Sequence, residues 1–370
     1  MLGEAVKKLI WNLNELVSEE DVGEPFLSRQ GYRAYPFNIN YFKTISLVDS
    51  KRKLAFIDGG NCELIGAPNF SIQLNRIYFN IFQGKRRMPK TEIPEKIEFF
   101  SATSAKFRKD QIYFDTSIFP MTDEISEFLP KASDLSFSST DRRLMIGTSR
   151  ADIARVASIG RRFAEWEYAK HIIENELDEG DILIMDGTLR TAFTNESKYA
   201  KEAYKVAIEK GVIYSGLSKT SRLYTTTGLS LLGALRKLAN DFKIESIWYY
   251  YPVAESLSLE HKAAIFIVKL NDNSPRIFRY EINAEQVKFL SASDINEVMC
   301  QLSINSSDVS FPGYPYGLID ADYNARVKHE EVETYRIMLM TEISKLGSWP
   351  KFLRHIQSKD AHGILNFLRG

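Results

Sequence analysis

Residues 53–60 read KLAFIDGG, an apolar run that ends on Asp58 and is followed by two glycines. The run predicts a buried strand, and the glycines predict a turn directly after the aspartate. A second run of this design, DILIMDGTL at residues 181–189, stops on Asp186. If the two strands are neighbours and point the same way, both carboxylates lie at the same edge of one sheet.

The segments around these two runs alternate between strand and helix patterns. Residues 53–82 predict three consecutive antiparallel strands, and residues 148–177 predict one long helix. Helix and strand patterns then alternate through residues 198–283, and a last long helix is expected over residues 318–346. This order predicts an α/β fold with a mixed sheet flanked by helices.

The same patterns suggest a division of the chain. Residues 1–42 form an N-terminal helix and lead-in, residues 43–346 form the main domain, and residues 347–370 form C-terminal helices. Residues 84–147 mix short strands with Lys, Pro and Ser clusters, which is typical of an insertion.

Composition excludes several classes of protein. The chain has 370 residues, 44% hydrophobic and 26% charged, which excludes collagen, coiled coil and wholesale disorder. Its 48 basic and 48 acidic side chains balance, so net charge selects no partner. Two cysteines are too few for a disulfide framework, and no apolar run is long enough to span a membrane. A cytoplasmic protein is expected.

Carboxylates at strand ends are suitable ligands for Mg²⁺ or Mn²⁺, which bind oxygen atoms. Asp-Gly is also a common turn dipeptide, so either copy alone could be structural. Further acids occur in two pairs, Glu165 with Glu167 and Asp320 with Asp322. Members of each pair lie two positions apart, about 200° around a helix, so at most one of each pair can face a shared site. Asp322 is favoured within its pair because it lies close to the start of its helix.

Cations near phosphate would complete such a site. Lys219 and Arg222 lie on a loop just after a predicted strand, where they could hold a phosphate, and the pair Arg161 and Arg162 could grip a nucleic-acid backbone. Each could equally be a solvated surface residue. The histidines show no zinc spacing, and no P-loop, dinucleotide or nucleophile-elbow motif is present. Carboxylate-bound metal acting on phosphate therefore remains.

Five motifs, in this order, resemble those of the NurA nucleases. They are FIDGG, RRFAEWE, ILIMDGTL, GLSKTSRL and GYPYGLIDADYNARV, and they span residues 58–327. The resemblance implies an RNase H-like core, a nuclease site with two Mn²⁺ or Mg²⁺ ions, and a homodimeric ring that admits DNA. It implies 5′ to 3′ exonuclease activity on single- and double-stranded DNA, with endonuclease activity on single strands. The implied partner is a HerA-type hexameric ATPase, in nucleoid-associated DNA end resection for double-strand break repair.

The resemblance also implies roles for individual residues. Asp58, Glu165, Asp186 and Asp322 would be metal ligands, with Glu167 and Asp320 as the competing assignments. Lys219 would lie near the scissile phosphate. Gly60 stands where the family more often has serine.

Two other functions are compatible with these residues. One is a catalytically silent RNase H-like scaffold that binds nucleic acid or an ATPase, with the acids in turns and on the surface. The other is an RNA-cleaving enzyme similar to RNase H or Argonaute, because recognition of a 2′-hydroxyl leaves no mark on this sequence.

Overall fold

The computed structural model describes residues 2–16, 21–27, 31–256 and 258–356. The chain forms two compact units. The first unit comprises Met1–Ser50, Gly187–Leu189 and Ser215–Pro315. The second unit comprises Lys51–Asp186, Arg190–Tyr214 and Tyr316–Gly370.

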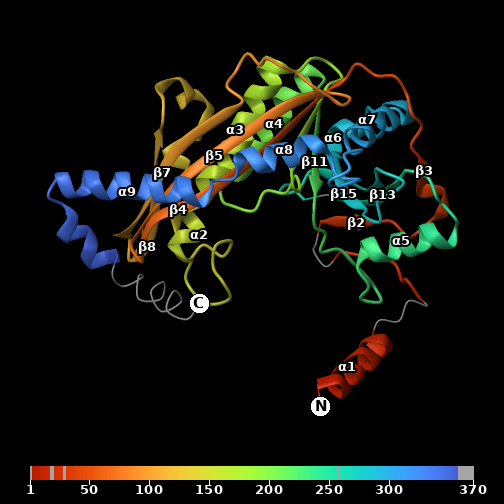
Figure 1. Cartoon of the computed structure of the whole chain (residues 1–370), viewed down its shortest axis with the longest axis horizontal. Coiled ribbons are helices and arrows are strands. Elements are labelled where there is room, and N and C mark those ends of the chain that lie inside the picture. Colours follow the sequence, from red (N-terminus) through yellow and green to blue (C-terminus); the bar gives the residue numbers. More distant parts are fainter. Residues whose placement is uncertain (1, 17–20, 28–30, 257, 357–370) are drawn as a thin grey trace. The chain divides into compact units, whose positions relative to one another are not determined.

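The second unit is built on a mixed sheet (Figure 1). Its strands, in spatial order, are β10 (Ile182–Asp186), β4 (Lys53–Ala67), β5 (Phe70–Gln83), β7 (Lys96–Arg108), β8 (Gln111–Pro120) and β9 (Ser136–Ser138). Strands β4 through β9 pair antiparallel, whereas β10 pairs parallel to β4. The short β6 (Arg86–Arg87) pairs with β5. The region 84–147 thus extends the sheet with its own strands.

Helices cover both faces of this sheet. They are α2 (Ile153–Ala157), α3 (Ile159–Glu176), α4 (Glu196–Lys210), α8 (Tyr316–Ala325) and α9 (His329–Lys345). A Cβ atom on Gly317 of α8 would lie 2.0 Å from the ring of Phe56, whereas a Cβ on Gly59 would lie 2.5 Å from Oε1 of Glu165 in α3. Successive residues of a strand point to opposite faces of the sheet, and Phe56 and Gly59 are three positions apart. Helices α8 and α3 therefore lie on opposite faces of β4. Figure 1 shows α8 and α9 running across the strands.

The expected turn after Asp58 is wrong. Strand β4 continues through Gly59 and Gly60 to Ala67 and pairs with β5 over almost all of that length. Residues 53–82 therefore form two long strands instead of three short ones. The two glycines serve close packing: a Cβ on either would meet an atom of α3 or the last residue of α8 well inside van der Waals contact.

Two expected helices are each divided in the structure. The segment 148–177 forms α2 and α3, which meet at Ser158. The segment 318–346 breaks between α8 and α9, where the carbonyl of Arg326 accepts a hydrogen bond from Arg76 Nη1 (2.9 Å). Lys328 N–H donates to Glu331 Oε2 (2.9 Å), which caps the start of α9. Side chains distant in sequence thus stabilise a break that hydrophobic periodicity does not reveal.

The first unit contains a second set of paired strands. They are β2 (Tyr32–Ala34), β3 (Phe42–Thr44), β13 (Trp248–Ser256), β14 (Ala263–Lys269), β15 (Phe278–Asn283) and residues 215–218 of β11 (Ile213–Ser218). Strands β1 (Pro25–Phe26) and β12 (Tyr224–Thr225) form a separate pair. Its helices are α1 (Leu2–Leu16), α5 (Leu231–Asp241), α6 (Ala284–Val287) and α7 (Ala292–Asn305).

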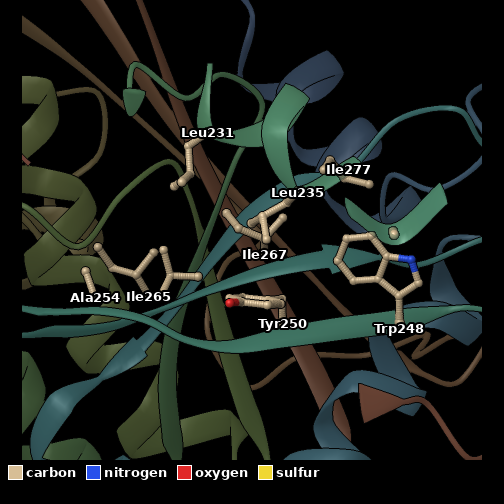
Figure 2. Packing of buried hydrophobic residues seen from close by; sticks show 10 residues of the cluster. Leu231, Leu235, Trp248, Tyr250, Ala254, Ile265, Ile267 and Ile277 are labelled. Atoms are coloured by element: carbon tan, nitrogen blue, oxygen red, sulfur yellow. The ribbon is translucent and has the colours of Figure 1, made fainter. Parts of the chain in front are cut away.

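The hydrophobic core of the first unit lies between α5 and strands β13 and β14 (Figure 2). Leu231 and Leu235 of α5 face Tyr250 and Ile267 of the strands, and all four are fully buried. This cluster fixes α5 on one face of the paired strands.

The proposed division at residues 42 and 346 stays a prediction, and residues 357–370 lie outside the described residues. Among the helices that the structure describes, none is long and apolar enough to cross a membrane.

Candidate metal centre

Asp58 and Asp186 are held side by side by strand pairing. Parallel strands β4 and β10 are in register from Leu54 opposite Ile182 to Ile57 opposite Met185. The next residue on each strand is an aspartate, so the two carboxylates follow the last paired positions. The sequence predicts that both carboxylates lie at one sheet edge if the two strands are neighbours and point the same way. In the structure the strands are neighbours and parallel.

Asp322 joins these two aspartates from helix α8. One carboxylate oxygen from each of Asp58, Asp186 and Asp322 lies within 4.8 Å of the others, and all three residues are half-buried. Three carboxylates this close repel one another, although Arg326 Nη2 lies 3.0 Å from Asp322 Oδ2 and offsets part of the charge. A divalent cation would remove the remaining repulsion. The donor set consists of oxygen atoms, so the residues present fit Mg²⁺ or Mn²⁺.

Two close contacts fix α8 against β4 and so place Asp322. A Cβ on Gly60 would lie 2.2 Å from the carbonyl oxygen of Ala325, and Gly317 lies against Phe56 at the other end of the helix. Gly60 is two residues from Asp58, and Ala325 is three residues from Asp322. The absence of side chains at both glycines therefore lets strand and helix approach closely on either side of the aspartates.

Glu165 lies on α3 beside the same strand. Glu165 is 8% exposed. Its Oε1 atom lies against Gly59 and pairs with Nη1 of Arg161. Burial raises the pKa of Glu165, Arg161 and Arg162 oppose that rise, and the negative charge of Asp186 adds to it. Arg161 Nη1 also donates to the carbonyl oxygen of Gly59 (2.8 Å). Glu165 is thus within electrostatic reach of Asp186.

The competing assignments have other partners. Glu167 pairs with Lys170 and lies 3.6 Å from Nε2 of His171. Burial raises the pKa of Glu167, but the hydrogen bonds with His171 and Lys170 and the charge of Lys170 outweigh that effect and lower the pKa. Asp320 Oδ2 accepts a hydrogen bond from Asn80 Nδ2 (2.8 Å) and lies 3.6 Å from Arg87 Nη1. Neither belongs to the group of three aspartates.

The predicted cations are distributed over both units. Arg162 pairs through Nε with the fully buried Glu196 (2.5 Å) and donates through Nη2 to the carbonyl of Arg190, so its guanidinium stabilises the core around α3 and α4. Lys219 and Arg222 lie in the first unit, after β11, and both are exposed. Lys219 Nζ lies 5.7 Å from the centroid of the Tyr314 ring.

A buried polar network in the first unit escaped the sequence reasoning. Gly187 N–H donates to the carbonyl of Leu217 (2.8 Å), and Leu189 N–H donates to Oε2 of Glu281 (2.8 Å). Glu281 is fully buried and contacts His261 (2.8 Å) and Arg279 (2.5 Å). Burial alone would raise the pKa of Glu281, but the charge of Arg279 and the contact with His261 outweigh it and lower the pKa to about 2.

This network fastens the three residues that follow Asp186. The only sequence signal is that Arg279 and Glu281 alternate onto one face of a strand. Their partners lie in distant segments, so the sequence gives no reason to connect them with the aspartate.

Fold and site together define an α/β protein with a mixed sheet flanked by helices and a carboxylate cluster where two parallel strands end. The model of the NurA domain matches residues 52–327, so the chain belongs to the NurA family. The predicted family and fold class are thereby confirmed.

Several solved structures are similar to the chain to different degrees. The NurA nuclease from Sulfolobus solfataricus is similar with a TM-score of 0.51 and 15% identity, covering 92% of this chain and 95% of that chain. Endonuclease V from Ciona intestinalis in complex with DNA matches at a TM-score of 0.34 and 8% identity, covering 77% and 87%. Argonaute from A. aeolicus matches at 0.29 and 10% identity, covering 76% and 29%. No curated protein sequence matches the chain.

Proposed function

We propose that this protein is a metal-dependent DNA nuclease whose site is formed by Asp58, Asp186 and Asp322, with Glu165 beside it. The observation that carries the proposal is the convergence of three aspartates, from two strands and a helix, on a region in which their oxygen atoms lie within 4.8 Å of one another. Membership of the NurA family supports the same chemistry.

The three aspartates would hold Mn²⁺ or Mg²⁺, and Glu165 would complete the ligand set once released from Arg161. A cation bound there would lower the pKa of a water molecule and would stabilise the charge of the leaving oxygen, and two ions would divide these tasks. The strand pairing and the contact at Gly60 keep the carboxylates in place without substrate. The pairing of Glu165 with Arg161 keeps that buried carboxylate compensated.

We propose the finer activity by extension from the family. The proposed reaction is 5′ to 3′ exonuclease cleavage of single- and double-stranded DNA, with endonuclease cleavage of single strands. A homodimer would act with a HerA-type hexameric ATPase in DNA end resection. Lys219 is proposed to contact the scissile phosphate and Arg222 a neighbouring one, because both are exposed cations on one loop.

The test uses matched carboxylates on the same helices. Asp322→Asn should lower Mn²⁺-dependent degradation of single-stranded DNA about 100-fold or more, since a metal ligand contributes several kcal/mol to the transition state. Asp320→Asn, two residues away on α8, should keep activity near that of the wild type. Glu165→Gln and Glu167→Gln form the second pair, in which only Glu165→Gln should lose activity.

Metal titration by calorimetry gives a readout independent of cleavage. Asp58→Asn and Asp186→Asn should weaken Mn²⁺ binding while circular dichroism spectra stay unchanged. Equal activity of Asp322→Asn and Asp320→Asn would refute the site. A wild-type protein that binds Mn²⁺ but cleaves neither DNA, RNA nor hybrid would instead be the silent scaffold.

A further inference from the structure

Residues 141–162 carry an excess of positive charge that the rest of the chain lacks. They contain six arginines and two aspartates, although basic and acidic residues balance over the whole sequence. The segment lies in the second unit and comprises a loop, α2 and the start of α3. Such a local excess is typical of a surface that binds an anion.

Buried side chains fasten this segment to the second unit. Leu144 is fully buried, Ala151 is 7% exposed, and Ala151 N–H donates to the carbonyl of Ser139 (2.9 Å). Ile146 and Ser149 exchange backbone hydrogen bonds of 3.3 and 3.1 Å across a two-residue turn. The loop therefore forms a hairpin turn, and its backbone fixes the positions from which the exposed side chains extend.

Both aspartates of the segment already have structural roles. Asp141 accepts hydrogen bonds from Arg143 N–H (2.9 Å) and from Thr194 Oγ1 (2.7 Å). Asp152 caps α2 by accepting from Ala154 N–H (2.9 Å). Their carboxylates are engaged in shaping the loop, and the six arginines outnumber the two aspartates, so a net positive charge remains.

Five of the six arginines fall into two sets. Arg161 and Arg162 are committed to Glu165 and Glu196. By contrast Arg142, Arg150 and Arg155 are exposed, and across the described part of the chain no carboxylate lies within ion-pair distance of any of them. Arg155 Nη2 reaches the carbonyl of Arg143 at 3.5 Å, which brings the two ends of the loop together.

This segment leads into the candidate metal centre. After α2 the chain passes Ser158 and enters α3, where Arg161 binds both Glu165 and the carbonyl of Gly59, the residue after Asp58. A strand of DNA with one phosphate at the aspartates would have further phosphates on either side of it. The exposed arginines lie on the same segment as the arginine that touches the site.

We propose that Arg142, Arg150 and Arg155 form a binding surface for the sugar-phosphate backbone of the DNA strand that is cut. This inference rests on the proposed function and extends it to residues outside the metal centre. Arginine suits the task because its guanidinium stays charged and can donate two hydrogen bonds to one phosphate. Ile146, 63% exposed at the turn, adds an apolar contact for an unstacked base.

The test measures binding of a fluorescein-labelled single-stranded oligonucleotide to the full chain by anisotropy. EDTA is present, so binding is separated from cleavage. For single strands, affinity falls with salt with a slope of about 0.7 per phosphate contact. The triple variant Arg142→Ala, Arg150→Ala, Arg155→Ala should therefore lose about 2 units of slope and bind at least about 10-fold more weakly at 0.1 M salt.

Two further variants control for net charge and folding. Lys345→Ala, Lys351→Ala, Arg354→Ala removes three exposed charges at and beyond the end of α9, which packs on the opposite face of the sheet, and should keep wild-type slope and affinity. Replacing the three proposed residues by lysine keeps their charge and should keep most of the slope, so it shows whether an effect of alanine reflects misfolding.

The outcomes separate this surface from the proposed function. An alanine triple with wild-type affinity and slope, or an equal loss in the α9 control, overturns the surface while Mn²⁺-dependent cleavage by the wild type can still support the nuclease. Wild-type binding without any cleavage overturns the nuclease and leaves the surface to be judged on the slopes. If the wild type does not bind DNA at all, both are wrong.

Discussion

Replacing Gly60 by alanine tests whether close contact between β4 and α8 sets the position of the aspartates. The new Cβ would lie 2.2 Å from the carbonyl oxygen of Ala325 and 2.9 Å from its carbonyl carbon. Both atoms belong to the backbone, so no side-chain rotation can relieve the contact. The strand and the helix must move apart instead.

The size of that movement can be worked from the contact distances. Real Cβ atoms essentially never approach another atom within 3.0 Å, so the 2.2 Å contact must open by at least about 0.8 Å. Overpacking of this kind lowers the free energy of unfolding by about 1 to 3 kcal/mol. Because Asp58 and Asp322 lie two and three residues from the contact, most of the shift reaches the pair. A displacement near 1 Å lowers a reaction rate by about 100-fold.

The assay compares Mn²⁺ affinity, DNA cleavage and urea unfolding in Gly60→Ala and in Gly160→Ala. Gly160 lies in α3, and its Cβ would meet only Leu135 Cδ1 at an ordinary 3.8 Å. Alanine there should stabilise the helix by about 0.5 to 1 kcal/mol and leave activity unchanged. If Gly60→Ala binds Mn²⁺ and cleaves DNA like the wild type, the contact does not position the aspartates and the reasoning fails.

Three other outcomes are expected. Since the folded-state pKa of Glu281 is lowered to about 2 from 4.5, its contribution to stability is complete above pH 4.5 and falls as the pH drops towards 2. Urea unfolding should show wild type losing about 2 kcal/mol more than Glu281→Gln between pH 6 and pH 3; parallel losses would contradict the assignment. Arg76 is buried between Glu98 (2.5 Å) and Glu331 (2.6 Å), so Arg76→Met should lower the free energy of unfolding by about 3 to 5 kcal/mol. A urea midpoint like that of the wild type would disprove this. In thermal unfolding, Mn²⁺ at 100 times its Kd should stabilise the wild type by about 2.7 kcal/mol. Asp58→Asn should lose that gain but, without metal, be at least as stable as the wild type; an unchanged metal effect would count against the site.

Two aspartates of the candidate site could be predicted from the sequence because each stands at the end of a recognisable strand pattern. The repeated design of an apolar run ending on Asp-Gly is local, so Asp58 and Asp186 are visible without knowledge of the fold. The sequence could not decide between Glu165 and Glu167. The angle between them around the helix is known, but which of them faces the aspartates depends on how α3 is rotated against the sheet. In the structure Glu165 faces Gly59, whereas Glu167 lies with Lys170 and His171 one turn further along its own helix.

The glycines after Asp58 were misread for a related reason. A Gly-Gly pair predicts a turn when only its neighbours in sequence are considered. Here both positions lie within an extended strand, and what requires glycine is Glu165 on one face and Ala325 on the other. These contacts join residues more than 100 and more than 260 positions apart, so no window of sequence contains them.

The pattern of charge compensation around the strand end explains why the cluster can exist before any metal binds. The buried carboxylate nearest to it, Glu165, has its own cation in Arg161, and the same guanidinium also binds the backbone of Gly59. The three aspartates stay only half-buried, so water can still screen their mutual repulsion. Rigid strand pairing and the Gly60 contact hold them together despite that repulsion. A site built in this way would be arranged for a cation in advance, and the free energy that the repulsion costs the metal-free protein would become part of its affinity for metal.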